Sequence, residues 1–321
     1  MNFLTNLSIG ASRTLRYSKF SARSFSSLLH PFDETTAVER VGQGSFSANI
    51  TNLYSVGPAP NGGYLASIAV NAAKASFDVP VNEFDDCLSV SGHFHTMADH
   101  DNKEAEIETR IMSKSRSSAS VQVNIVQQGI TRCSWLVLLG NLSKMKGITA
   151  INSSPPVLPP REDCMNASAE IQKAFNGAFK LADEIEFLVP KTDAFALTTL
   201  AGKSNIGAKA RVSGWMRFAE DRVPNCEFFC DAITPPSLNL HMSNWVPSLE
   251  YSCHFFSNPM KDYKNESSNW VKFRFASDVV QNGLLDTDGE IWSAGEGEDG
   301  SESRILARSR QLARHLIPRE K

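Results

Sequence analysis

Long stretches of the chain alternate between apolar and polar residues, which is the pattern of β-strands. In residues 304–316, the face that holds Ala307 and Ser309 is small and apolar, and it ends in Gln311. A strand that closes such a face with an amide must let that amide reach water or give it a buried partner. The same pattern predicts strands over residues 88–94, 104–115, 118–129, 132–142, 210–218, 248–256, 269–280, 283–294 and 304–316.

Two predicted helices interrupt these strands. Asn61 is a favourable N-cap for the first helix, whose body up to residue 79 is small and apolar nearly all round and is followed by Pro80. A helix without a polar face belongs in a core. The second helix is predicted to open at Pro224, to run through residues 226–233 and to end at Pro235.

The chain repeats itself. The segments LSVSGHF (residues 88–94) and LEYSCHF (residues 249–255) share the pattern LxxSxHF, and each follows a predicted helix and precedes long strands. This indicates an internal duplication. We therefore expect an α+β fold of two antiparallel sheets, each wrapped around a central helix and joined edge to edge. The predicted units are residues 32–150 and 171–321, with a proline-rich linker over residues 151–170 between them.

The first 31 residues differ in composition from the rest. They are rich in serine, contain arginine and lysine, and no acidic residue occurs before Asp33. This composition is typical of a mitochondrial transit peptide, and a disordered N-terminus is the alternative. We accordingly expect a mitochondrial matrix protein, with a cytoplasmic location as the alternative.

Composition excludes several classes of partner. The chain has 321 residues, 41% of them hydrophobic, and a formal net charge of −3 without a long basic stripe, so we expect no nucleic-acid binding. No apolar run is long enough for a membrane span. The six cysteines form neither a CxxC pair nor a zinc-site spacing, so we expect no metal and no cofactor.

Five segments occur in an order that resembles a known family: FDETTAVER, GPAPNGGYLA, PSLEYSCHFF, DGEIW and ARSRQLA. Over roughly residues 32–316 they are similar to the acyl-CoA thioesterase II-like family. The resemblance implies a double hotdog fold, an acyl-CoA substrate and hydrolysis to free acid and CoA. Two hotdog units in one chain already supply the pairing surface that single-unit relatives gain by dimerising, so a homo-oligomer is left open.

The resemblance also implies a catalytic set. In that family an aspartate of the second-half helix, a hydroxyl residue at the start of the next strand and a glutamine of the last strand hold the attacking water. By position these are Asp231, Ser248 and Gln311. Apolar neighbours would desolvate Asp231 and raise its pKa, as a general base requires. Serine stands where related enzymes commonly have threonine, and it lacks the methyl group that fixes the rotamer. Gln311 would face inward because its amide has a water to hold.

The first turn of the first helix has a separate predicted use. Gly62, Gly63 and Tyr64 form this turn, and glycine lets a ligand approach the backbone. N–H groups at a helix start favour a developing oxyanion, and in the family the thioester carbonyl would point there, without a covalent acyl-enzyme. The first-half helix contains no acidic residue. We therefore expect one active site in each chain.

Two other functions are compatible with the sequence. A hotdog hydratase or dehydratase acting on enoyl or hydroxyacyl thioesters would need an acid–imidazole pair, for which His254 is the candidate imidazole. A non-catalytic acyl-thioester-binding protein would be favoured by an exposed Asp231 or a closed tunnel. The chain contains no GxSxG nucleophile motif, which argues against an α/β-hydrolase thioesterase.

Overall fold

The computed structural model describes residues 31–77, 83–100, 104–174, 177–220, 222–232, 235–243, 245–258, 269–295 and 303–316. The predicted transit peptide lies outside these residues apart from Pro31, and the mitochondrial location stays a prediction. No helix in the described part of the chain is both long and apolar enough to cross a membrane.

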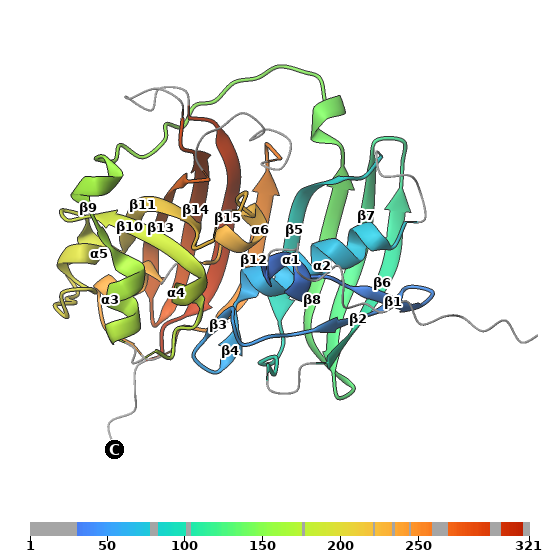
Figure 1. Ribbon diagram of the computed structural model, residues 1–321, viewed down its shortest axis with the longest axis horizontal. Helices are drawn as coiled ribbons and strands as arrows, with labels where there is room; N and C mark the ends of the chain where they lie inside the picture. Colours follow the sequence, from blue (N-terminus) through green and yellow to red (C-terminus); the bar gives the residue numbers. More distant parts are fainter. Residues whose placement is uncertain are drawn as a thin grey trace, which may run out of the picture.

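Among the described residues, one continuous antiparallel sheet of 13 strands forms the body of the molecule (Figure 1). A separate hairpin pairs β3 (Ser55–Val56) with β4 (Ala59–Pro60). Across the large sheet the order is β1 (Glu39–Gly42), β2 (Ser45–Asn49), β6 (Glu104–Lys114), β7 (Ser118–Gln127), β8 (Ile130–Gly140), β5 (Asp86–Phe94), β12 (Ser248–Phe255), β15 (Ile305–Arg314), β14 (Leu284–Ser293), β13 (Val271–Gln281), β11 (Arg211–Phe218), β10 (Ile185–Pro190) and β9 (Cys164–Asn166).

The two halves meet where the repeated segments pair. β5 and β12 lie side by side antiparallel, and Ser91 of one LxxSxHF segment pairs with Ser252 of the other. Equivalent residues opposite each other are what a two-fold relation between the halves requires. Each of the two strands also carries a register shift at the equivalent place, just after Cys87 and just after Ser248. The predictions of a duplication and of an edge-to-edge junction are confirmed.

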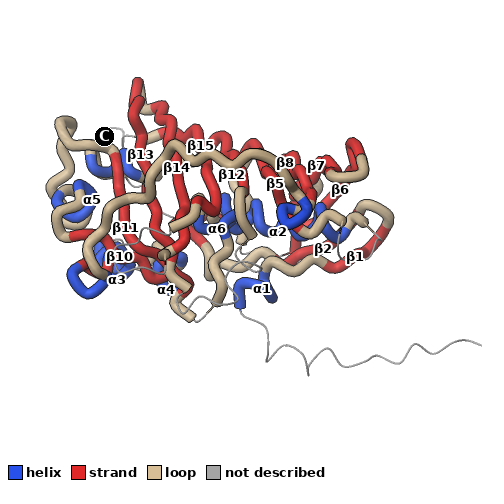
Figure 2. The backbone as a smooth tube through the Cα atoms, turned by 90° about the horizontal axis from the view of Figure 1, so that it is seen from above, coloured by secondary structure: helices blue, strands red, loops and turns tan. Residues whose placement is uncertain are grey.

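The central helices cover one face of this sheet. Figure 2 shows α2 (Gly62–Ala75) and α6 (Cys226–Phe229) on the same side of the strands, with α1 (Pro31–Thr35) beside them. The inner faces of the strands and nearly all of α2 are buried in a single apolar core. The remaining helices are α3 (Ala167–Ala174), α4 (Leu181–Glu184), α5 (Ala194–Leu197) and the 3₁₀ turns η1 (Leu142–Lys144), η2 (Arg161–Asp163) and η3 (Pro236–Asn239).

The second central helix is much shorter than the sequence predicts. We expected it to run through residues 226–233, but α6 is a single turn capped by Asn225. The chain then tightens, because the N–H of Asp231 donates to the carbonyl of Phe228, a 3₁₀-type bond of 3.0 Å. Asp231 therefore lies in the turn after the helix. Prolines at 235 and 236 disfavour a further helical turn after it.

Part of the predicted linker belongs to the second half of the sheet. β9 pairs with β10, and α3 begins at Ala167, both within residues 151–170. The irregular segment before β9 is attached to the sheet, since the indole N–H of Trp215 donates to the carbonyl of Pro159 over 3.1 Å.

Candidate active site

The carboxylate of Asp231 receives hydrogen bonds from both halves of the chain. The N–H of Gly63, in the first turn of α2, donates to Oδ2 over 2.9 Å. Asn61 Nδ2 donates to the same oxygen over 3.0 Å and to the main-chain carbonyl of Asp231 over 2.7 Å. On the other side, Gln311 Nε2 of β15 donates to Oδ1 over 2.6 Å. The two halves of the chain thus meet at one carboxylate.

Gln311 joins Asp231 to Ser248. Its Nε2 donates to Ser248 Oγ as well as to Asp231 Oδ1, so both amide protons are used. This answers the question raised by the strand pattern, because the amide at the end of the small apolar face has two part-buried side-chain partners. The three residues that the family resemblance selected lie together, one from the turn after α6 and one each from β12 and β15.

Burial and hydrogen bonding act in opposite directions on the pKa of Asp231. Burial favours the neutral form, whereas the donors from Gly63, Gln311, Gly62 and Asn61 favour the carboxylate. The carboxylate also lies at the N-terminus of a 14-residue helix, where the helix dipole favours a negative charge. Burial prevails and raises the pKa from 3.8 to about 6. An aspartate with this pKa is ionised at neutral pH and remains basic enough to accept a proton.

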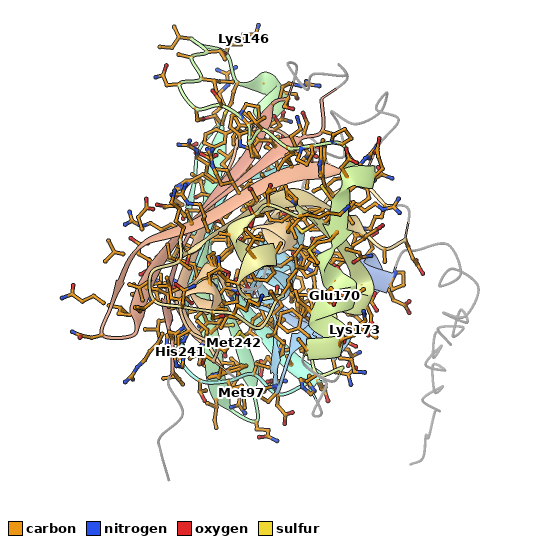
Figure 3. The ribbon with its side chains drawn as sticks, turned by 90° about the vertical axis from the view of Figure 1, so that its left-hand side faces the viewer. Met97, Lys146, Glu170, Lys173, His241 and Met242 are labelled. Atoms are coloured by element: carbon orange, nitrogen blue, oxygen red, sulfur yellow. The ribbon has the colours of Figure 1, made fainter. Side chains whose placement is uncertain are left out.

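A cavity of about 440 Å³ opens beside these groups. Its wall is largely apolar and comes from both halves, and it includes Asp231, Ser248 and Gln311. Figure 3 shows Met97, His241 and Met242 at one end of the molecule. Met97 lines the cavity and is 52% exposed, so the cavity reaches the surface at this end. The larger apolar side chains of the lining include Val56, Leu65, Phe94, Met97, Phe179, Leu181, Leu238, Trp245, Val246 and Leu249.

The first turn of α2 differs from its predicted arrangement. The N–H of Gly63 binds Asp231, so the anion that it holds is a carboxylate of this chain. Tyr64 is not part of the site: its N–H donates to the capping Asn61 over 3.0 Å, and its buried hydroxyl donates to the carbonyl of Thr35 over 3.0 Å. Gly62 does line the cavity.

Both halves of the chain match known protein families. Residues 51–140 match the family described as "Acyl-CoA thioesterase N-terminal domain", and residues 161–314 match "Acyl-CoA thioesterase C-terminal domain". The chain belongs to the acyl-CoA thioesterase II family. Among curated proteins, no sequence matches this chain.

Several solved structures share the double hotdog fold of this thioesterase II family protein. A candidate thioesterase II from Thermobifida fusca YX is 23% identical, with a TM-score of 0.70 over 90% of this chain and 99% of its own. A hotdog protein of unknown function from Alicyclobacillus acidocaldarius is 18% identical, with a TM-score of 0.73 over 91% of this chain and 100% of its own. The acyl-CoA thioesterase II TesB2 of Mycobacterium marinum is 16% identical, with a TM-score of 0.59 over 89% and 98% of the two chains.

The two-fold relation between the halves identifies the residue of the first half that corresponds to Asp231. Asp231 lies six residues after Asn225, the N-cap of α6, and Ser67 lies six residues after Asn61, the N-cap of α2. The contact is also repeated, because Ser67 Oγ donates to Asn225 Oδ1 over 3.2 Å. A serine therefore stands where the second half has its aspartate.

The other two positions are apolar or sulfur-containing in the first half. Val90 pairs with Val137 as Tyr251 pairs with Gln311, so Val137 corresponds to the glutamine. Cys87 precedes the first repeated segment as Ser248 precedes the second. The first half thus lacks counterparts of the Asp231 carboxylate and the Gln311 amide, and one active site per chain stays a prediction.

The candidate imidazole for a hydratase lies elsewhere. Inward positions of β12 are Tyr251, Cys253 and Phe255, whereas His254 is exposed on the outer face. The prediction that His254 could pair with an acid of the site is wrong, because strand alternation turns it away from α6. Within the described residues there is no group of three metal-ligating side chains.

Asn61 was expected only to cap a helix, although it contacts the candidate base directly. The capping role is confirmed, since Oδ1 accepts from the N–H of Tyr64 over 3.0 Å. The second contact joins residues 170 positions apart, for which the local pattern contains no signal.

Proposed function

We propose that this protein is an acyl-CoA thioesterase in which Asp231 is the general base that activates water. The observation that carries the proposal is a carboxylate with a pKa raised by burial to about 6, bound to the amide of Gln311 at the wall of a largely apolar cavity. An apolar cavity of several hundred Å³ suits an acyl chain.

The remaining hydrogen-bonding groups suit a water molecule. Gln311 uses Nε2 for both of its bonds, which leaves Oε1 as an acceptor, and Ser248 accepts from Gln311, which leaves its O–H as a donor. A water between these two groups and Asp231 would be oriented with a lone pair toward the thioester carbonyl.

The reaction then follows from the positions of these groups. The water oxygen attacks the carbonyl carbon as its proton passes to Asp231, which gives a tetrahedral oxyanion. When the intermediate collapses, the carbon–sulfur bond breaks, and the thiolate of CoA takes the proton that Asp231 carries. The products are the carboxylic acid and the free thiol, and the carboxylate of Asp231 is restored.

Free-thiol release from a panel of acyl-CoAs, from short to long chains with aromatic and branched members, tests this proposal. We expect Asp231→Asn to lower kcat by about 10²–10⁴-fold with its fold intact. In the parent protein, kcat/KM should rise about tenfold per pH unit up to pH about 6 and then level off, because only the carboxylate accepts a proton. Asp278→Asn is the matched control, since the Asp278 side chain is 83% exposed.

The other functions give different results in the same experiment. Binding of acyl-CoA without thiol release from any member would refute hydrolysis and favour a binding protein. Hydration of enoyl-CoA without thiol release would favour the hydratase. Full turnover in Asp231→Asn would remove Asp231 from the role of base.

A further inference from the structure

Asn61 makes a pair of contacts that a helix cap does not require. Its Oδ1 accepts from the N–H of Tyr64, which satisfies the cap. Its Nδ2 donates to two oxygens of one residue, the main-chain carbonyl of Asp231 at 2.7 Å and the carboxylate Oδ2 at 3.0 Å. The side chain is buried, with only 5% of the residue exposed. Such a buried amide keeps a single orientation only if its surroundings specify it.

The cap specifies the orientation. Because Oδ1 must face the N–H of Tyr64, Nδ2 must face the turn that follows α6. A donor that bonds both the main chain and the side chain of Asp231 restricts the position of the backbone and the χ1 angle of the carboxylate together. Gly63 donates to the same oxygen, so Oδ2 is held by α2 and Oδ1 remains directed to Gln311.

We propose that Asn61 is a positioning residue of the active site, which holds the Asp231 carboxylate toward Gln311 and keeps it ionised. The inference rests on the proposed function, because it assigns Asn61 a role through the base of that reaction. It also makes the active site dependent on both halves, since the cap of the first helix orients the base of the second.

The chain contains a matched control for this role. Asn225 caps α6 as Asn61 caps α2, with Oδ1 accepting from the N–H of Phe228 over 2.8 Å. Its partner across the two-fold is the neutral hydroxyl of Ser67. A substitution at Asn225 therefore removes a cap of the same kind without removing a donor from the Asp231 carboxylate.

Among the described residues, the charged and titratable groups around Asp231 include His95 and Arg132, which line the same cavity. Tyr251 of β12 lies close to it, and Cys253 of the same strand contacts Cys230; burial raises the pKa of both well above the ordinary value, so both are neutral near pH 6. Cys230 precedes it and Glu227 lies one turn earlier on α6. From α2 the groups that face the carboxylate are N–H donors and the amide of Asn61. Loss of one donor to the charged form should raise the pKa of Asp231.

The test is a carboxyl NMR titration of Asp231 in the full chain, together with the pH profile of kcat/KM. Asn61→Ser retains a capping hydroxyl but loses the Nδ2 donor, and we expect the pKa to rise by about 0.5–1. Turnover at neutral pH should fall about tenfold. The acid limb of the kcat/KM profile should move to higher pH by about 0.5–1, the same shift as the pKa. Asn61→Asp retains the capping oxygen and places a second carboxylate beside Asp231, so its shift should be larger.

Asn225→Ser decides between positioning and capping alone. It should lower the melting temperature about as much as Asn61→Ser while the titration of Asp231 stays in place. The inference is overturned if Asn61→Ser and Asn61→Asp leave the titration and the acid limb unchanged. The titration does not depend on turnover, so it still reports on Asn61 if Asp231→Asn remains active and the proposed function fails.

Discussion

The two glycines at the start of α2 are required by space. A Cβ at Gly63 would lie 2.7 Å from the carbonyl oxygen of Glu227 and 2.8 Å from that of Phe228. At Gly62 it would lie 2.8 Å from Asp231 Oδ2 and 2.7 Å from the ring of Phe94. The missing side chains let the backbone of α2 approach α6 closely enough for the Gly63 N–H to reach Asp231.

Gly63→Ala should therefore lower stability and activity together. The obstructing atoms at Gly63 belong to the backbone of α6 and cannot rotate away, so the helices must separate. We expect a loss of about 1–3 kcal/mol in the free energy of unfolding, measured by urea denaturation, and weaker thiol release. Gly147→Ala is the control, because nothing lies within 4 Å of a Cβ there. Equal effects of the two substitutions would contradict a close helix–helix contact.

At the scale of elements, β12 holds the short α6 in place. The hydroxyl of Tyr251 donates to the carbonyl of Glu227 over 2.9 Å, and the Sγ atoms of Cys253 and Cys230 lie 3.4 Å apart. A helix of one turn has almost no stability of its own. The position of the turn that carries Asp231 thus depends on contacts with the strand beneath it.

Tyr251→Phe tests this support. The substitution keeps the fully buried ring and leaves the part-buried Glu227 carbonyl without its donor, which should cost about 1–3 kcal/mol in the free energy of unfolding. We also expect lower kcat, because the turn after α6 loses an anchor. Ser252→Ala, on the outer face of the same strand, should change stability by less than about 0.5 kcal/mol. A Tyr251→Phe protein that matched the parent in both measurements would remove β12 from this role.

The elements that could be predicted from the sequence are those defined by alternation of apolar and polar residues or by a helix cap. The long strands were predicted because one face of each is buried, and α2 because Asn61 and a small apolar body define it. β1 was missed because its four residues are all exposed and carry no apolar face. The length of α6 was wrong because the helix ends at Phe229, before the prolines, in a tight turn whose position depends on tertiary contacts rather than on helical periodicity.

The candidate active site, too, could be predicted from the sequence only in part. That Gln311 faces inward could be predicted from the small face of its strand, and Asp231 and Ser248 were selected by the family resemblance. That Gly63 and Asn61 donate to Asp231 could not be predicted, because these bonds form only when α2 packs against α6. Spacing along the chain does not encode how closely two helices approach.

At the scale of the whole molecule, the two halves of the duplication differ, because one holds a carboxylate and an amide and the other holds an uncharged counterpart. Asp231 and Gln311 correspond to Ser67 and Val137, which are buried in the core of the first half. The first half nevertheless supplies donors to the second, through Gly63 and Asn61. A carboxylate enclosed in this way is useful as a base, but its charge is disfavoured by burial and should reduce the stability of the whole fold.

Asp231→Asn should therefore make the protein more stable while it lowers kcat. Below pH about 3.8 the carboxyl is protonated in both states and this group costs nothing. As the pH rises through about 6, the folded state must ionise a partly buried group, at a cost of roughly 3 kcal/mol at most, reduced to about 1–2 by its contact with the cavity. Asparagine avoids this cost, and rotation of the Gln311 amide would let Oε1 accept from it.

Urea denaturation at two pH values measures this effect. At about pH 8 the free energy of unfolding of Asp231→Asn should exceed that of the parent by about 1–2 kcal/mol, and near pH 4 the difference should nearly vanish. Asp278→Asn, an exposed position, should change stability little at either pH. A gain of the same size at both pH values would mean that packing rather than charge is responsible. A loss at about pH 8 would mean that the four donors outweigh burial and that the carboxylate stabilises the fold, which would require an Asp231 pKa below its ordinary value.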